Sequence, residues 1–277
     1  MSEAGSRGPH QWDAETYDAI SDPQFSWGME VLERLELRGE ETVVDAGCGS
    51  GRVTAELAKR VPRGRVVAVD GSEAMIGKAR ERLGDRASYV VSDLTELQLP
   101  DPADLIFSTA TFHWVLDHER LFARLRGNLA PGGRLVAQCG GEGNVADHAG
   151  AVATVAARPE FAPHFGGATV MWNFAGREET EARLRAAGFS EVRCWLEHRT
   201  VAPEDPLRFT MTATLAPHLT RLPEHLHLPF TEAVLALSPD PLTLDYVRLN
   251  IEASAGAGAP STSIQSHPDR PRSPIDP

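Results

Sequence analysis

Short apolar runs alternate with amphipathic stretches between residues 42 and 139. The runs are rich in Val, Leu, Ile and Ala, which is typical of strands that are buried on both faces. The stretches between them carry apolar residues at helical spacing. This alternation predicts βαβ units, in which helices cover both faces of a mainly parallel sheet. The predicted strands are Thr42–Ala46, Arg65–Asp70, Ala87–Val91, Ala103–Thr109 and Arg134–Cys139.

Capping residues and helix breakers set the ends of the helices between these strands. Proline disfavours continuation of a helix, and glycine commonly follows a helix end. Pro131-Gly132-Gly133 predicts a turn before the fifth strand. The predicted helices are Arg52–Val61, a second from its cap at Ser72 to Leu83, and a third from its cap at Asp117 through Leu129.

The flanking regions predict further helices and two more strands. Residues 11–37 have helical spacing that is interrupted at Asp22-Pro23. Beyond residue 140 the pattern predicts helices at Asp147–Ala157 and Arg177–Ala187, strands at Glu191–Arg199 and Leu242–Ile251, and mainly helical structure over residues 203–237.

Composition divides the chain into one domain and two tails. Residues 1–10 are small and polar, and residues 253–277 are rich in Ala, Gly, Ser and Pro. Such segments bury too little apolar surface to offset the entropy of ordering. We therefore expect disorder in both tails and one folded domain over residues 11–252. Two segments of that domain, residues 142–176 and 203–237, are predicted to form a lid above one edge of the sheet.

Charge and cysteine content narrow the class of protein. The formal net charge is −12, and no run of Lys and Arg exceeds two residues, which disfavours a nucleic-acid partner. The three cysteines form no paired motif, as suits a reducing compartment. We find no apolar run long enough to span a membrane and no secretory signal, and we expect a cytoplasmic protein without membrane contact. No cluster of residues has metal-ligand spacing.

A glycine-rich loop joins the first predicted strand to the first helix. Gly47, Gly49 and Gly51 follow a G-x-G-x-G spacing, whereas dinucleotide-binding loops have G-x-G-x-x-G. Asp45 precedes the loop, where a carboxylate would repel a pyrophosphate but suits a cationic amino group. The loop therefore favours a nucleoside that carries an amino acid, namely S-adenosylmethionine.

Two further carboxylates follow the second and third strands. Asp70 can accept hydrogen bonds from both hydroxyls of a ribose. Asp93 can bind the exocyclic amine of adenine, with Leu94 on one side of the ring and Met75 on the other. Each has a structural alternative: Asp45 could bind loop N–H groups, both Asp70 and Asp93 could cap helices, and Met75 could belong to the core.

These motifs resemble the class I S-adenosylmethionine-dependent methyltransferases, especially the group that includes trans-aconitate and juvenile hormone acid methyltransferases. The resemblance implies a Rossmann-like α/β fold with seven strands in the order 3-2-1-4-5-7-6, the last strand antiparallel. It also implies cofactor contacts after the fourth strand and an N-terminal helical segment that places Trp12 and Tyr17 near the methionine. The stretches that carry it are Trp12–Asp18, Val43–Gly51, Val66–Ser72, Asp93, Phe107–Val115 and Leu129–Gly133.

The predicted cofactor site combines the loop, the strand ends and this N-terminal segment. Its members are Trp12, Tyr17, Asp45, Ala46, Gly47, Gly49, Gly51, Asp70, Gly71, Ser72, Met75, Ser92, Asp93, Leu94, Thr109 and Ala110.

The acceptor side of the site is predicted around His113, Trp114 and Trp172. His113 follows the fourth strand and is the candidate catalytic base, or alternatively a residue that only forms hydrogen bonds and shapes the pocket. A carboxylate acceptor would need no base, whereas a hydroxyl or a carbon acid would. Arg177 or Arg208 is a candidate for holding an acidic substrate. The remaining histidines, among them His148 and His218, are predicted to have packing or surface roles.

Three functions compete at this point. The first is methylation of a small molecule by a monomer or homodimer. The second is methylation of protein or RNA, which the acidic charge disfavours. The third is a non-catalytic S-adenosylmethionine-binding module.

Overall fold

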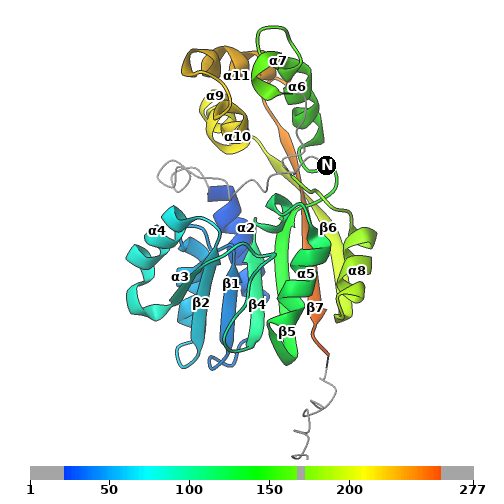
Figure 1. The fold of residues 1–277 in the computed structure, drawn as a ribbon. Coiled ribbons are helices and arrows are strands. Elements are labelled where there is room, and N and C mark those ends of the chain that lie inside the picture. Colours follow the sequence, from blue (N-terminus) through cyan, green and yellow to red (C-terminus); the bar gives the residue numbers. More distant parts are fainter. Residues whose placement is uncertain (1–21, 167–171, 257–277) are drawn as a thin grey trace, which may run out of the picture.

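The computed structural model describes residues 22–166 and 172–256 (Figure 1). Within them seven strands form one sheet with the order β3-β2-β1-β4-β5-β7-β6. β7 is antiparallel to both of its neighbours, whereas the pairs from β3 to β5 are parallel. The expected strand order and the antiparallel last strand are confirmed. The strands are β1 Thr42–Ala46, β2 Arg65–Asp70, β3 Ser88–Val91, β4 Ala103–Thr109, β5 Leu129–Gly140, β6 Ser190–Val201 and β7 Leu244–Ser254.

Helices cover both faces of the sheet, as the alternation predicts. On one face, α5 and α8 pack over Val44, Ile106 and Leu135. On the other, α2 and α3 pack over Val43, Leu105 and Val136, and α4 covers β2 beside them. Apolar side chains at alternate strand positions thus fill two separate layers of core. The helices are α2 Asp22–Glu33, α3 Arg52–Arg60, α4 Glu73–Leu83, α5 His118–Gly127 and α8 Arg177–Ala186.

The predicted caps form, but one helix end is wrong. Ser72 Oγ accepts a hydrogen bond from the Met75 amide, and Asp117 Oδ1 accepts one from the Arg120 amide. α5 ends at Gly127 instead of Leu129, and β5 already includes the glycines of the predicted turn. The Asn128 side chain explains this end, because its amide donates to the carbonyl oxygens of Leu97 and Arg124 and fixes the chain as it leaves the helix.

The remaining helices form a cap beyond the carboxyl ends of the parallel strands (Figure 1). They come from the two segments predicted as lid, and β6 and β7 connect the cap to the sheet. Val152, Phe161, Leu215 and Phe230 belong to its own apolar core. The cap comprises α6 Ala146–Ala156, α7 Ala162–Phe165, α9 Pro206–Phe209, a π-helical turn Thr210–Thr214 (η3), α10 Ala216–Leu219, a short 3₁₀ turn Glu224–Leu226 (η4) and α11 His227–Leu235.

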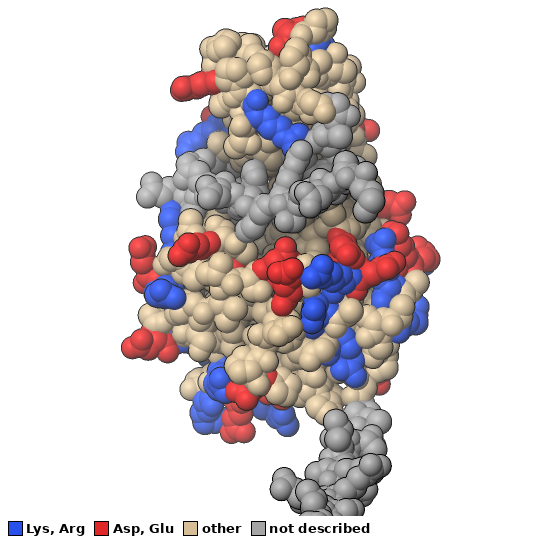
Figure 2. Space-filling model, in the orientation of Figure 1, with Lys and Arg blue, Asp and Glu red and all other residues tan. Residues whose placement is uncertain are grey.

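Charged side chains are unevenly distributed over the surface seen in Figure 2. Over the sheet domain, acidic and basic side chains are interspersed, whereas the described part of the cap is mostly uncharged in this view. Among the described residues, no helix combines the length and apolar character needed to span a membrane.

The sheet extends beyond the expected end of the domain. We expected the tail to begin at residue 253, but β7 continues to Ser254, and Ala253 and Ala255 are buried. Ala255 donates its amide hydrogen to the Gly133 carbonyl oxygen at 2.7 Å, and Arg126 Nη2 donates to the Ala255 carbonyl oxygen at 2.5 Å. Residues 1–10 and 257–277, where disorder is predicted, lie outside the described residues.

Two truncations should separate strand from tail. Removal of residues 253–277 deletes these hydrogen bonds and two buried alanines, and we expect the melting temperature to fall by about 4–8 °C. Removal of residues 257–277 keeps all of these contacts and should leave the melting temperature unchanged. Equal melting curves for the two truncated proteins, measured by calorimetry, would contradict the assignment of residues 253–256 to the fold.

Candidate active site

The glycine loop is held against two neighbouring strands. Gly47 and Cys48 both donate their amide hydrogens to the carbonyl oxygen of Val69, at 2.8 and 2.9 Å. Gly47 has φ +86°, and a Cβ at this position would lie 2.2 Å from the Thr111 side chain. Only glycine tolerates both the left-handed backbone and this approach. The loop after β1 is therefore locked to the ends of β2 and β4.

Asp45 lies beneath this loop at the end of β1. Its side chain is buried, and Oδ2 accepts a hydrogen bond from Thr54 Oγ1 of α3 at 2.7 Å. Burial raises its pKa to about 7, and the nearby Asp70 adds to the rise. A nearby cation would favour the ionised form of this carboxylate, because the opposite charge compensates for the water that burial excludes.

Asp70 connects the glycine loop to the start of α4. Its Oδ2 accepts from the Gly49 amide at 3.0 Å, and its Oδ1 accepts from the Ser72 amide at 2.8 Å. Burial raises the pKa of Asp70, and the two amide hydrogen bonds oppose the rise. The carboxylate thus fixes the loop, and the capping residue of α4 is Ser72 and not Asp70, the alternative considered for Asp70.

The other two loop glycines have different surroundings. At Gly49 a Cβ would meet no atom within 4 Å, so the loop is open on this side. At Gly51 a Cβ would lie 2.8 Å from Leu83 and close to Ala79. The close approach at Gly51 is therefore to α4, and Gly49 is the glycine that leaves room for a ligand.

The residues expected around the adenine have strong partners within the protein. Asp93 Oδ1 accepts from both the amide and the hydroxyl of Thr95, at 2.7 and 2.8 Å, and so stabilises a turn, because no helix follows Asp93 for it to cap. Leu94 belongs to the main core cluster, and Met75 is also buried. Ser92 joins β3 to β2, because its amide donates to the Asp70 carbonyl oxygen. Gly71 and Ser72 lie between Asp70 and α4, and Ser72 is the N-cap residue of that helix.

The chain turns sharply after β4. Ala110 has φ +55°, a left-handed conformation that is costly for a residue with a Cβ and occurs mainly at functional sites. Its amide donates to the Gln138 carbonyl oxygen at 2.7 Å. The next residue, Thr111, donates its hydroxyl hydrogen toward the carbonyl oxygens of Gly47 and Thr109. This turn places Phe112–Trp114 at the carboxyl edge of the sheet, beside the glycine loop.

His113 lies in this turn and is buried. The Gly140 amide donates to Nδ1 of the ring at 3.3 Å, which assigns the ring proton to Nε2. Burial lowers the pKa of His113 well below its usual value, and the positive charge of Arg248 lowers it further. The ring is therefore neutral at physiological pH, with one lone pair used by the backbone and an N–H left to donate.

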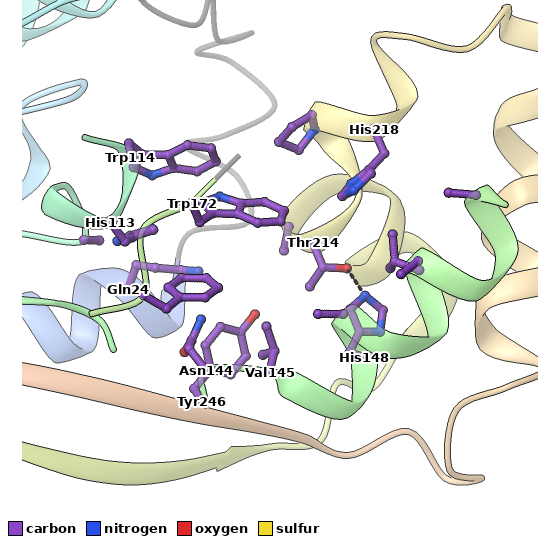
Figure 3. A pocket seen from close by; sticks show the side chains of 18 of the residues that line it. Gln24, His113, Trp114, Asn144, Val145, His148, Trp172, Thr214, His218 and Tyr246 are labelled. Carbon is purple, nitrogen blue, oxygen red and sulfur yellow. Dashed lines mark hydrogen bonds between the residues drawn. The ribbon is translucent and has the colours of Figure 1, made fainter. Parts of the chain in front are cut away.

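A cavity of about 380 Å³ extends from this edge into the cap (Figure 3). His113, Trp114 and Trp172 line it, so the structure brings the predicted acceptor residues together. Trp12 and Tyr17, also predicted for the site, lie outside the described residues. Further lining side chains come from α2, α6, the π-helical turn, α10 and β7: Gln24, His148, Thr214, His218, Tyr246 and Arg248.

Arg248 is the charged residue of this cavity that the sequence prediction missed. It is 3% exposed, packs over the Trp27 ring at 4.8 Å and donates to Gln138 Oε1 at 3.5 Å. Arg177, by contrast, pairs with the neighbouring Glu178 at the surface, and neither Arg177 nor Arg208 lines the cavity. The sequence does contain a signal for this residue, because Arg248 interrupts the alternating apolar positions of residues 244–251.

The chain is similar in sequence to several known proteins. Residues 44–137 match the family model described as a methyltransferase domain. Trans-aconitate 2-methyltransferase of Variovorax paradoxus is 43% identical over 128 residues, which cover 46% of this chain and 49% of the relative. Trans-aconitate 2-methyltransferase of Deinococcus radiodurans is 30% identical over 223 residues, 76% of this chain and 83% of that protein.

The chain belongs to the class I S-adenosylmethionine-dependent methyltransferases. A phosphoethanolamine N-methyltransferase of Haemonchus contortus shares the methyltransferase fold, with a TM-score of 0.57 and 18% identity over 88% of this chain and 57% of that one. The chain spans about half the length of the first curated methyltransferases that it matches. The match to the family model, residues 44–137, includes the glycine loop, whereas the cap lies beyond it.

The described part of the chain contains no cluster of side chains that could bind a metal ion. Across residues 22–166 and 172–256, no group of three or more His, Cys, Asp and Glu side chains could hold a metal ion.

Replacement of Asp45 by Asn tests the buried carboxylate. The affinity of the wild-type protein for S-adenosylhomocysteine should fall about tenfold for each pH unit below the pKa of about 7, because only the ionised carboxylate pairs with the amino group. Asp45→Asn should bind more weakly and without this pH dependence, as measured by calorimetry below about pH 7.5, where that amino group stays protonated.

The same variant should affect stability in the opposite direction. A folded-state pKa above the unfolded value makes Asp45 favourable at low pH, and this contribution is lost as the pH rises toward 7. At pH 8 the ligand-free Asp45→Asn protein should therefore be more stable than wild type by about 1–3 kcal/mol, with the difference vanishing near pH 4. A variant that is less stable at pH 8 would contradict the raised pKa.

Replacement of Asp70 by Ala tests the connection between loop and cofactor. Loss of a carboxylate that holds two amide groups should weaken S-adenosylhomocysteine binding by about 3 kcal/mol, roughly a hundredfold. Asp101→Ala is the matched control, because Asp101 pairs with Arg65 at the surface. Equal affinities of the Asp70→Ala and wild-type proteins would show that Asp70 has no part in cofactor binding.

Proposed function

We propose that this chain is an S-adenosylmethionine-dependent methyltransferase that methylates the carboxylate of a small molecule. One observation carries the choice of acceptor: the buried Arg248 and the neutral His113 line the same cavity, together with Ala110 of the turn after β4. Family membership supports the cofactor and the reaction type. The trans-aconitate 2-methyltransferases among the relatives support a carboxylic acid as acceptor.

The residues of the loop fit the proposed cofactor. Gly49 is open to a ligand, and Asp45 is a buried carboxylate suited to an ammonium group. Gln24 Oε1 is buried and has no hydrogen-bond partner among the described residues, so it offers an acceptor to a bound donor group. Asp70 would face the ribose from the end of β2. When bound, S-adenosylmethionine supplies an electrophilic methyl group on a sulfonium.

Arg248 and His113 would hold the acceptor carboxylate. The guanidinium supplies positive charge and paired N–H donors, which match the geometry of a carboxylate. His113 would donate a further hydrogen bond from Nε2, because Nδ1 accepts from Gly140. Such contacts fix one carboxylate oxygen toward the methyl group, and alignment is the main requirement of an in-line displacement.

No residue has to remove a proton in this reaction. A carboxylate is already ionised at physiological pH, and its oxygen becomes the ester oxygen without proton transfer. Between the two roles left open for His113, hydrogen-bond donation fits the neutral ring with an occupied Nδ1 better than base catalysis does.

The alternative acceptors fit the surface less well. The cavity has a volume of about 380 Å³ and is lined by residues of the sheet edge and of the cap (Figure 3), which suits a small molecule better than a peptide or an RNA. On the face in Figure 2 acidic and basic side chains are interspersed, which does not favour a phosphate backbone. The three cysteines are unpaired and buried, which supports the cytoplasm as the compartment.

Two substitutions of His113 test its role. His113→Asn keeps an acceptor near Nδ1 but removes the Nε2 donor, and should raise KM for a carboxylate acceptor about tenfold or more. His113→Gln restores an N–H near Nε2 and should recover part of this loss. Affinity for S-adenosylhomocysteine should stay the same in both.

The pH profile tests whether His113 is neutral in the working enzyme. Because His113 stays neutral, kcat/KM relative to the cofactor-saturated enzyme should be flat between about pH 6 and pH 8. A profile that rises through this range in wild type and is flat in His113→Asn would identify His113 as a general base.

A further inference from the structure

The described lining of the cavity holds little positive charge for an acid-binding site. Arg248 is the one Lys or Arg among the described lining residues, and no Asp or Glu is among them. His148 and His218 also line it, and burial lowers the pKa of each to about 4, so both are neutral at physiological pH. One buried cation suits one carboxylate. Each additional carboxylate of a polyanion would be buried without a charge partner, which costs several kcal/mol.

An aromatic wall connects the two ends of the cavity. From His113 the rings follow in series: Phe174 lies 5.7 Å away, Trp172 lies 5.8 Å from Phe174, and His218 lies 5.7 Å from Trp172. Phe174 and Trp172 are nearly parallel, with planes inclined by 8°. The wall thus runs from the sheet edge into the cap and presents an extended apolar surface along the way.

Aliphatic side chains face this wall from the cap. Val152, Ala153 and Ala156 of α6 line the cavity together with Pro217 of α10. Small side chains on α6 leave width between the helix and the rings. The middle of the cavity therefore suits an apolar body and offers no partner to a charged one.

The far end of the cavity becomes polar again. There Thr214 Oγ1 and His148 Nε2 are hydrogen-bonded at 2.9 Å (Figure 3). The Nδ1 atoms of His148 and His218 have no hydrogen-bond partner among the described residues. Thr214 Oγ1 donates its hydrogen to the Thr210 carbonyl oxygen at 3.1 Å and therefore offers an acceptor, whereas a neutral imidazole can donate from one ring nitrogen and accept at the other. Both suit an uncharged polar group.

We infer that the acceptor is an amphipathic monocarboxylic acid with an uncharged polar group at the end opposite its carboxylate. The carboxylate binds at Arg248 and His113, the apolar body lies along the aromatic wall, and a hydroxyl or carbonyl reaches Thr214 and His218. This inference rests on the proposed function and narrows its substrate class. It also separates this chain from its relatives, which are named for a tricarboxylate.

Three acids of graded chemistry test the inference on the full chain. They are octanoate, the hydroxyoctanoate with its hydroxyl on the terminal carbon, and trans-aconitate. Methyl ester formation is followed by mass spectrometry, together with release of S-adenosylhomocysteine. We expect kcat/KM for the hydroxy acid to exceed that for octanoate by about tenfold, and that for trans-aconitate by about a hundredfold or more.

Substitutions at the far end test the polar contact separately. Thr214→Val removes the hydroxyl at nearly constant volume and should reduce the preference for the hydroxy acid over octanoate to about onefold. Thr212→Val is the matched control, because Thr212 lies on the same π-helical turn, donates to the Arg208 carbonyl oxygen and does not line the cavity. If Thr214→Val does not fold, His218→Phe keeps an aromatic ring against Trp172 and should likewise reduce the preference.

The outcomes separate this inference from the proposed function. Ester formation on trans-aconitate as efficient as on the hydroxy acid overturns the inference and leaves the proposed function standing. A hydroxyl preference that survives in folded Thr214→Val and His218→Phe overturns the far-end contact. No ester from any of the three acids, or methylation at the hydroxyl oxygen, by protein that binds S-adenosylhomocysteine in calorimetry overturns the proposed carboxylate methylation and the inference with it.

Discussion

Two backbone hydrogen bonds to the Val69 carbonyl oxygen hold the whole site together. They tie the glycine loop after β1 to the end of β2, and they form only because Gly47 adopts a left-handed backbone. The missing Cβ at Gly47 also admits the Thr111 side chain from the loop after β4. Three strand ends are thereby fixed relative to one another. The left-handed Ala110 and the buried His113 owe their positions to this junction.

Burial shifts the pKa values of two ionisable side chains in the site. It raises the pKa of Asp45 to about 7 and lowers that of His113 well below its usual value. Both groups therefore depart from the ionisation that they would have in water, and the resulting loss of stability is localised where ligands bind. Arg248 keeps its charge because a guanidinium has a very high pKa and because the Trp27 ring and Gln138 contact it. The site can thus present one permanent cation and neutral hydrogen-bonding groups.

In the proposed function, the cap supplies much of the lining that selects the methyl acceptor. The glycine loop lies within residues 44–137, which match the family model, whereas Trp172, Thr214 and His218 come from segments that β6, β7 and short connections join to the sheet. A helical cluster with its own apolar core can change its lining without disturbing the sheet beneath. This separation explains how a common cofactor site can serve different acceptors.

Local pattern alone determined the parallel sheet, most of its strand ends and the position of the cofactor loop. The bounds of β1, β2 and β4 and the cap at Ser72 follow from apolar runs and capping chemistry, which act over a few residues. The resemblance to known methyltransferases added the strand order. Tertiary structure alone decided which polar residues share the acceptor cavity. The polar lining residues are separated along the chain and have no common spacing; they are His148, Thr214, His218 and Arg248. The neighbouring sequence of each is typical of a packing or surface residue. They meet because the cap folds over the carboxyl edge of the sheet, and contacts between distant segments leave no periodic signal in the sequence.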